Sequence, residues 1–205
     1  MDVKFNLFKK IFNLNANYVK RTTKKIGSGV RVHLGPGEID LLGWINIDMR
    51  DLPHIHLVGG RDEFKKFSNS SLSEVYACHI LEHISIDDVK PLVQLLSSKI
   101  EKGGVIRLSV PDFDALIKIY NENGKNCKFI ERPLLGGQNY AFNFHKSIYN
   151  KKNLSNILTE CGFSSVEVWD SYEDFGIDIG DWSIQELETP LGRRFISLNL
   201  KAVKQ

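Results

Sequence analysis

A glycine-containing turn between two strand-like segments constrains the fold of this chain more than any other feature. The alternating run 30–34 ends in Gly35-Pro36-Gly37, and a second strand-like run, residues 44–47, ends in Asp48. Only nine residues separate Leu34 from Trp44, which leaves room for one short helical turn but not for a crossover helix. We therefore expect two adjacent strands whose ends carry bare main-chain amides and a carboxylate.

These features predict a site for a nucleoside-containing cofactor. Glycines allow backbone N–H groups to approach a ligand closely, and an acid at the end of the next strand can accept hydrogen bonds from a ribose diol. The dinucleotide fingerprint needs a third glycine, where Asp40 stands, and an acid about 20 residues further on. A phosphate-free nucleoside such as S-adenosylmethionine therefore fits better than a dinucleotide.

The bulk composition is that of a single globular domain. The chain has 205 residues, a formal net charge of +2 and 42% hydrophobic residues, so no strongly basic character points to nucleic acid. Three cysteines without metal-type spacing suit a reducing compartment. No apolar run approaches the length of a transmembrane helix. We expect a cytoplasmic protein, with a homodimer left open.

The first 27 residues differ from the rest, and we expect them to form an extension before a domain at 28–205. Residues 1–26 carry seven Lys or Arg and a single Asp, interleaved with apolar residues. Lys9 and Lys10 interrupt any apolar core, so this segment is not a signal peptide. Two alternatives remain: an amphipathic helix with a solvated basic side, or a peripheral contact with an acidic membrane surface or partner.

Strand and helix patterns alternate from residue 30 onward and predict an α/β fold. Capping residues and helical spacing indicate helices after Ser85, Asp112 and Asn150. Strand-like runs occupy residues 30–34, 44–47, 56–58, 74–78, 105–110, 165–169 and 195–203. We expect a Rossmann-like, three-layer αβα domain around a seven-stranded, mostly parallel sheet with an antiparallel pair at one edge. Residues 121–143 and 170–188 are expected to be irregular loops.

Three segments together resemble a known family. LGPGEIDLLGWINID, SLSEVYACHILEHI and EKGGVIRLSVPDFDAL, in this order and spacing, are similar to the class I S-adenosylmethionine-dependent methyltransferases. The resemblance is closest to a small bacterial branch linked to surface polysaccharides and sugar modification, and it covers residues 30–169. It implies methyl transfer to a small acceptor, an oxygen of a sugar or related metabolite, in surface-polysaccharide biosynthesis.

The resemblance also implies roles for individual residues. Gly35 and Gly37 would face the methionine end of the cofactor, and Asp48 the ribose. Two departures from the usual pattern are Pro36 between the glycines and Arg61 where an acid is common. The full set of expected cofactor contacts is Gly35, Pro36, Gly37, Asp48, Met49, Arg61, Asp62 and His79.

Methyl transfer to a hydroxyl group benefits from a general base, and histidine suits this role near neutral pH. We expect His145 to be the base, with His79 as a second catalytic candidate at the cofactor's edge. His145 could equally be a packing residue of the preceding loop. Tyr140, Asn143 and His83 are the expected substrate contacts, and no metal is expected.

Two alternative functions stay open. Residues 79–83 read H-x-x-E-H, the inverted signature of some zinc peptidases, in which two histidines one helical turn apart share a zinc ion. No further ligand is evident from the sequence, and the glycine turn and Asp48 would then have no role. The other alternative is a non-catalytic, methyltransferase-like domain that serves a partner.

Overall fold

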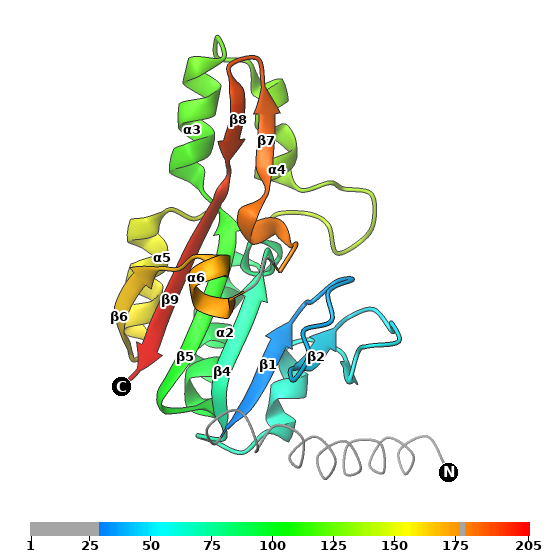
Figure 1. Ribbon diagram of the computed structural model, residues 1–205, viewed down its shortest axis with the longest axis vertical. Coiled ribbons are helices and arrows are strands. Elements are labelled where there is room, and N and C mark those ends of the chain that lie inside the picture. The colour runs from blue at the N-terminus through cyan, green and yellow to red at the C-terminus, as the bar shows by residue number, and fades with distance from the viewer. Residues whose placement is uncertain (1–28, 177–178) are drawn as a thin grey trace.

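A single mixed sheet dominates the protein (Figure 1). The computed structural model describes residues 29–176 and 179–205. Seven strands lie in the order β3-β2-β1-β4-β5-β9-β6, with β9 antiparallel to both of its neighbours and the other pairings parallel. This confirms the expected α/β class and the antiparallel edge. The strands are β1 (Val30–Leu34), β2 (Ile45–Asp48), β3 (Leu57–Val58), β4 (Leu72–Cys78), β5 (Ile100–Pro111), β6 (Phe163–Val168) and β9 (Ser197–Lys204).

The connection between β1 and β2 contains no helix, as the nine-residue spacing predicts. Leu34 pairs with Ile47 in parallel register, so the glycine turn and Asp48 leave the sheet side by side. The carboxyl ends of β4 and β5 lie at the same edge. Ligands of open α/β sheets bind beyond this edge, and every candidate residue that follows a strand gathers there.

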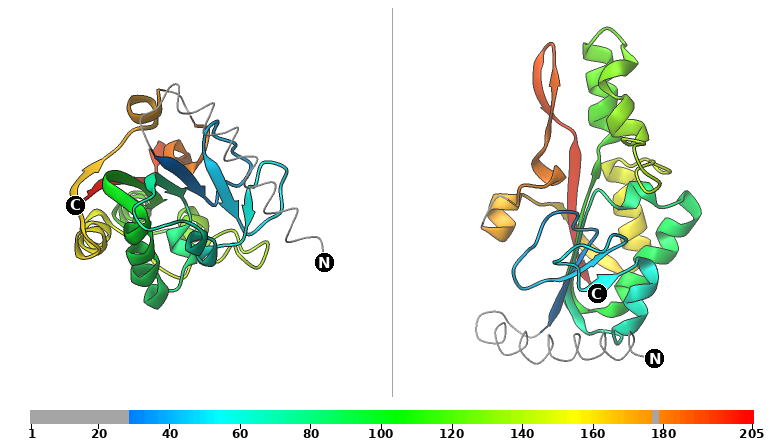
Figure 2. Two further views of the ribbon diagram at one scale, coloured as in Figure 1. Left: turned by 90° about the horizontal axis from the view of Figure 1, so that it is seen from below. Right: turned by 90° about the vertical axis from the view of Figure 1, so that its right-hand side faces the viewer.

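Helices α2 (Ile86–Lys99) and α5 (Lys151–Glu160) cover one face of the sheet (Figure 2). Side chains alternate along β4, so Val75 and Ala77 pack in the core beneath these helices, while Tyr76 and Cys78 lie on the opposite side. Asn150 caps α5 through Asn153 N, as expected. Ser85 precedes α2 as expected, but its hydroxyl donates to the Asp88 carboxylate at 2.6 Å instead of capping a backbone amide.

The other face is covered in the described residues by an aromatic cluster rather than by long helices. Trp44, Tyr76, Trp169 and Phe175 make edge and tilted ring contacts with one another. His33 of β1 stacks on Tyr76 with 4.8 Å between ring centroids. Large aromatic rings therefore fill the space that a β1–β2 crossover helix would otherwise take.

The two segments expected to be irregular contain regular structure, so that expectation was wrong in part. The first contains a short helix, α4 (Glu131–Leu135), and the second contains α6 (Ser171–Phe175). A hairpin of β7 (Glu186–Thr189) and β8 (Gly192–Phe195) precedes β9, where the sequence suggested one strand from residue 195. These elements are four or five residues long, too short for a periodic pattern to stand out.

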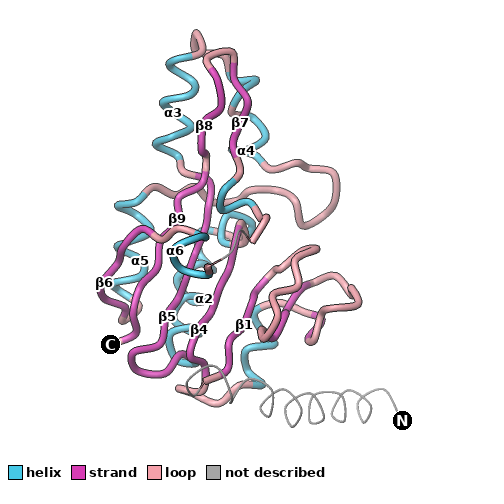
Figure 3. The backbone as a smooth tube through the Cα atoms, viewed as in Figure 1, coloured by secondary structure: helices cyan, strands magenta, loops and turns pink. Residues whose placement is uncertain are grey.

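The hairpin, α3 (Phe113–Glu122) and α4 form a small lobe beyond the carboxyl ends of the strands (Figure 1). Its core contains Leu116, Ile119, Ile130 and Ile196. Asp112 caps α3 as expected, accepting from Asp114 N at 3.1 Å. The backbone trace shows the long loop between α4 and α5 returning past the sheet edge below this lobe (Figure 3).

The expected N-terminal extension, residues 1–27, lies outside the described residues. Within the described part of the chain, no helix combines the length and the apolar character that crossing a bilayer requires.

Candidate functional site

The glycine turn after β1 is tied to Asp48 at the end of β2. One carboxylate oxygen of Asp48 accepts a hydrogen bond from Gly37 N at 3.1 Å, and the other accepts from Arg50 N at 2.8 Å. The Arg50 guanidinium lies 3.5 Å from the same carboxylate. Asp48 is buried, with 8% exposure. Its main-chain and guanidinium partners hold the carboxylate in place at the strand tip, where the ribose contact requires it.

Gly35 and Gly37 both have positive φ, 65° and 59°, which explains the need for glycine at each position. The two positions differ in their surroundings. A Cβ at Gly35 would meet the Ile80 side chain at 2.0 Å, whereas a Cβ at Gly37 would meet only the Arg50 guanidinium at 3.2 Å. Pro36 directs its carbonyl to Ile39 N at 3.0 Å. The turn is therefore open at Gly37 and covered by Ile80 at Gly35.

Two of the expected cofactor contacts, Arg61 and Asp62, follow β3, and each forms an ion pair with another side chain. Arg61 pairs with Asp88 of α2 at 3.5 Å, and Asp62 pairs with Lys65 at 2.7 Å. Hydrogen bonding to the Lys65 ammonium lowers the pKa of Asp62, which is fully exposed to solvent. Met49, directly after Asp48, is half exposed, and its Sδ would lie 3.3 Å from a Cβ added at Gly60. Of these three side chains, Met49 alone offers an apolar surface beside Asp48.

His79 follows β4 in a left-handed conformation, with φ of 53°. Its Nε2 lies 2.8 Å from Ser197 Oγ, and its Nδ1 lies 3.1 Å from Glu82 Oε1. The exposed Trp182 ring stands beside it, with 5.9 Å between centroids. This backbone separates His79 from the 3₁₀ turn Leu81–His83, so His79 and His83 do not share a helix face. The H-x-x-E-H segment lacks the helical geometry of a zinc peptidase.

His83 instead meets His145, which arrives from the loop after α4. The two rings are perpendicular, with 4.8 Å between their centroids. One potential metal-ligand atom from each of Glu82, His83 and His145 lies within 4.8 Å of the others. The structure thus brings together two residues expected to act on the substrate side, His83 and His145, and adds Glu82.

Charge interactions within this cluster are strong because Glu82 is 1% exposed. Burial acts to raise the pKa of Glu82, but the nearby imidazoles of His79 and His83 outweigh it and bring the pKa below its usual range. Burial lowers the pKa of His145, and the Glu82 charge opposes that effect. The cluster therefore favours an ionised carboxylate next to a neutral His145 near neutral pH.

Main-chain hydrogen bonds fix the loop that carries His145. Lys146 N and Ser147 N both donate to the carbonyl of Glu82, at 2.6 and 3.2 Å. Ser147 Oγ donates to the carbonyl of Leu81 at 3.1 Å. His145 is therefore held opposite the 3₁₀ turn by bonds on its immediate neighbours.

The remaining expected substrate contacts lie further out on the same loop. Asn143 donates through its side chain to Asn139 at 2.7 Å, and its backbone N donates to the carbonyl of Tyr140. Tyr140 is about half exposed. These contacts shape the loop itself, so Asn143 serves first to fold it, and Tyr140 presents its ring to solvent.

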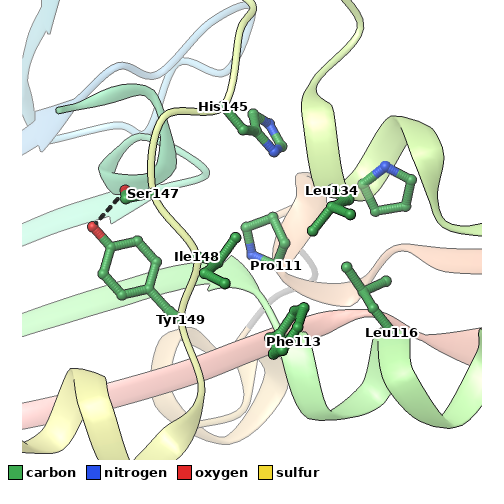
Figure 4. A pocket seen from close by; sticks show the side chains of 9 residues that line it. Pro111, Phe113, Leu116, Leu134, His145, Ser147, Ile148 and Tyr149 are labelled. Carbon is green, nitrogen blue, oxygen red and sulfur yellow. Dashed lines mark hydrogen bonds between the residues drawn. The ribbon is translucent and has the colours of Figure 1, made fainter. Parts of the chain in front are cut away.

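A shallow pocket lies on the α3 side of His145 (Figure 4). Its lining is mostly apolar, with Pro111, Phe113, Leu116 and Leu134 opposite the histidine. The enclosed space is about 10 Å³, about the room that one water molecule needs. The pocket is therefore a small apolar depression beside His145 and does not enclose a cofactor or an acceptor.

Sequence reasoning missed Glu82 as a central residue of the site. The sequence places Glu82 next to His83, but nothing in it shows that the carboxylate is buried. Its role emerges from the long-range approach of residues 145–147, for which one sequence carries no direct signal. The H-x-x-E-H pattern was the available hint, and the structure changes its partners from His79 and His83 to His83 and His145.

No family model and no curated protein sequence matches this chain. Solved structures do match in fold. A SAM-dependent methyltransferase from Archaeoglobus fulgidus is 16% identical, with a TM-score of 0.57 over 99% of this chain and 100% of the other. A SAM-dependent methyltransferase from Thermotoga maritima, described as a possible histamine N-methyltransferase, is 12% identical, with a TM-score of 0.53 over 98% and 92% of the two chains.

A third match is Burkholderia thailandensis 1,6-didemethyltoxoflavin-N1-methyltransferase, solved with 1,6-didemethyltoxoflavin and S-adenosylhomocysteine bound. It is 12% identical, with a TM-score of 0.53 over 92% of this chain and 77% of the other. At these identities the likeness concerns the fold, and the chain has the class I methyltransferase fold.

Proposed function

We propose that this protein transfers a methyl group from S-adenosylmethionine to a small acceptor. The observation that carries the proposal is the parallel pairing of β1 and β2, which sets the glycine turn beside a buried Asp48 at the ligand-binding edge of a class I methyltransferase fold. The structural neighbours named above support the same reaction class.

The residues at the strand tips fit the cofactor on chemical grounds. The carboxylate of Asp48 is an acceptor for the ribose diol, the amide of Gly37 is a donor for the carboxylate of the methionine end, and Met49 offers apolar surface to the adenine base. Asp48 must exchange its bond to Gly37 N for a bond to the ligand, so binding replaces one charge-assisted hydrogen bond with another. Ile80 must move if Gly35 is also to contact the ligand.

S-adenosylmethionine, when bound, supplies a methyl group on a positively charged sulfur that is already a good leaving group. The protein contributes alignment of the acceptor with that methyl group and a destination for the acceptor's proton. The hydroxyl proton passes to the cluster around His79, Glu82, His83 and His145.

For the acceptor we propose a sugar or a related polyol in surface-polysaccharide biosynthesis, methylated on oxygen. The exposed Trp182 ring beside His79 supports this, because an aromatic face suits the C–H surface of a sugar ring. Two of the structural neighbours are described as N-methyltransferases, so nitrogen is the competing acceptor atom.

The experiment is calorimetric titration of the purified chain with S-adenosylhomocysteine, followed by methyl-transfer assays with labelled S-adenosylmethionine. Acceptor panels of sugars and amines separate oxygen from nitrogen. Micromolar binding of S-adenosylhomocysteine and label transfer to a sugar are expected. Transfer to amines alone overturns the acceptor class, and absence of binding overturns the enzymatic function.

A non-catalytic binding domain is the second candidate, and one observation favours it. Ile80 fills the space above Gly35, and Asp48 is already bonded to its own main chain, so the strand tips are satisfied without a ligand. The same titration decides between the two functions, because this alternative predicts no heat of binding with S-adenosylhomocysteine.

A further inference from the structure

The cluster of Glu82, His83 and His145 has the composition of a metal site. One potential ligand atom from each side chain lies within 4.8 Å of the others. Two imidazoles and one carboxylate are a ligand set that zinc and other first-row divalent ions use in sites that keep positions open for water or substrate. The sequence suggested zinc only through His79 and His83 of the H-x-x-E-H segment, because it did not bring His145 to Glu82 and His83.

The Glu82 carboxylate is the strongest indication of a missing positive partner. The residue is 1% exposed, and neither carboxylate oxygen accepts a well-aligned hydrogen bond from the described residues. The imidazole of His79 lies beside it, with Nδ1 3.1 Å from Oε1. A buried carboxylate is costly unless paired, hydrogen-bonded or bound to a metal, and Glu82 here has one such contact for two oxygens.

His83 uses one ring nitrogen for a main-chain carbonyl, with Nδ1 3.2 Å from the carbonyl of Phe144. A carbonyl oxygen only accepts, so Nδ1 carries the proton of this contact, and Nε2 is the ring nitrogen left for a metal ion. Metal-binding histidines are oriented in the same way by such outer contacts.

Hydrogen bonds join the two segments that carry the candidate ligands without the help of a metal ion. Lys146 N and Ser147 N donate to the carbonyl of Glu82 itself, so the segment after His145 is bonded to the residue that supplies the carboxylate. Ser147 Oγ adds a bond to the carbonyl of Leu81. Two sequence-distant segments are thus joined at the positions that flank the candidate ligands, which preorganises the ligand set.

We propose that Glu82, His83 and His145 bind a divalent first-row transition-metal ion such as Zn²⁺. Three protein ligands leave coordination positions for water, next to the pocket lined by Pro111 and Leu134. His79 is a positioning residue that orients the Glu82 carboxylate. If the proposed methyl transfer is correct, an open position would also receive the acceptor oxygen, and that part of the inference rests on the proposed function.

The test measures metal binding without any cofactor. The purified full-length chain is stripped with a chelator, dialysed and titrated with Co²⁺, followed by visible absorption, and with Zn²⁺, followed by calorimetry. We expect one ion per chain. Glu82→Gln and His145→Ala should each weaken binding by at least about 100-fold, since loss of an outer contact alone costs roughly 10–100-fold.

His54→Ala is the matched control. His54 is another partly buried histidine, with Nε2 2.9 Å from the carbonyl of Gly37, and it lies outside the cluster. Its loss should leave both stoichiometry and affinity unchanged. Far-ultraviolet circular dichroism of each variant confirms folding, and His145→Ala is favourable in this respect because it changes a loop residue that is only partly buried.

Two outcomes overturn the proposal. If the wild-type chain binds no stoichiometric metal, the cluster of Glu82, His83 and His145 is not a metal site. If Glu82→Gln and His145→Ala both bind as the wild type does, the metal site lies elsewhere. The same samples are titrated with S-adenosylhomocysteine. Metal binding without cofactor binding would overturn the proposed methyl transfer alone, and cofactor binding without metal binding would overturn the metal site alone.

Discussion

The same edge of the sheet carries two polar regions that differ in how far their hydrogen bonds are satisfied. At the tips of β1 and β2, Asp48 accepts from Gly37 N and Arg50 N, and a ligand must compete with these bonds. At the 3₁₀ turn, the buried oxygens of Glu82 have a single imidazole contact, and two histidines stand opposite. The first region is satisfied by its own groups, whereas the second contains a buried carboxylate with one imidazole contact, where we have proposed that a metal ion binds.

This difference teaches how the two regions would respond to ligands. Exchange of one hydrogen bond for another contributes modestly to net affinity, because the free protein gives up what the complex gains. A preformed ligand set loses little conformational entropy when the ion binds. Ion binding should therefore stabilise the fold strongly, and cofactor binding should depend on a few replaceable contacts.

The largest expected effect is on heat stability. Metal at about 1,000 times its dissociation constant should stabilise the wild-type fold by about 4 kcal/mol, which raises the melting temperature by about 8–16 °C in a domain of this size. Differential scanning calorimetry with and without chelator measures the shift. His145→Ala should show no such difference. If the wild type has the same melting temperature with and without chelator, metal binding does not stabilise the fold, and the predicted difference between the two regions is wrong.

The next effect concerns Asp48→Ala, which should weaken binding of S-adenosylhomocysteine by about 1–3 kcal/mol through loss of charge-assisted hydrogen bonds. Asp51→Ala is the matched control, an exposed acid three residues further on that should bind as the wild type does. Isothermal titration calorimetry gives both affinities. Equal affinities in Asp48→Ala and the wild type would remove the ribose role of Asp48.

Acid should lower the folding stability of the protein through protonation of His33 in β1. Burial lowers the pKa of His33 from 6.5 to about 4, with the Asp181 charge opposing the shift. The unfolded chain therefore binds more protons between these values, and stability falls as the pH drops below 6.5. Between pH 7 and pH 5 the His33 contribution to this loss is about 2 kcal/mol.

Urea unfolding at the two pH values measures this loss, and His33→Phe isolates it. The phenyl ring keeps the stacking on Tyr76 and cannot be protonated, so the variant should lose less stability on acidification than the wild type. Identical pH dependence in both proteins would show that protonation of His33 does not cause the loss of folding stability in acid.

The smallest effect separates backbone strain from ligand contact. Gly37→Ala and Gly124→Ala both place a Cβ at positive φ, 59° and 69°, and each should cost about 1 kcal/mol of folding stability. Gly124 lies in the turn after α3 with nothing within 4 Å of the added Cβ. Urea midpoints should therefore fall equally, whereas only Gly37→Ala should lose affinity for S-adenosylhomocysteine. Loss in both variants would point to general destabilisation.

The fold was predictable from the sequence because its signals are local and long enough to recognise. Alternating apolar residues, the caps Asp112 and Asn150, and the glycine turn each fix an element within a few residues. The hairpin and α6 were missed because four or five residues show too little periodicity. Strand order follows from the resemblance rather than from spacing.

The candidate site was predictable only in parts. Gly37 and Asp48 come together because parallel strands in register end together, a rule that needs no coordinates. The partners of His145 were not predictable, because they depend on a main-chain contact between the turn at Glu82 and a loop more than sixty residues away. The burial of Glu82 follows from that contact and was equally hidden.

One hydroxyl group settles the tautomer of His79. Ser197 Oγ donates its proton to the carbonyl of Trp182, 2.7 Å away. The hydroxyl can therefore only accept a hydrogen bond from His79 Nε2. The Nε2 proton is thereby directed at Ser197, and Nδ1 is the ring nitrogen that faces Glu82. A serine at the start of β9 thus orients an imidazole ring that lies 118 residues away in the sequence.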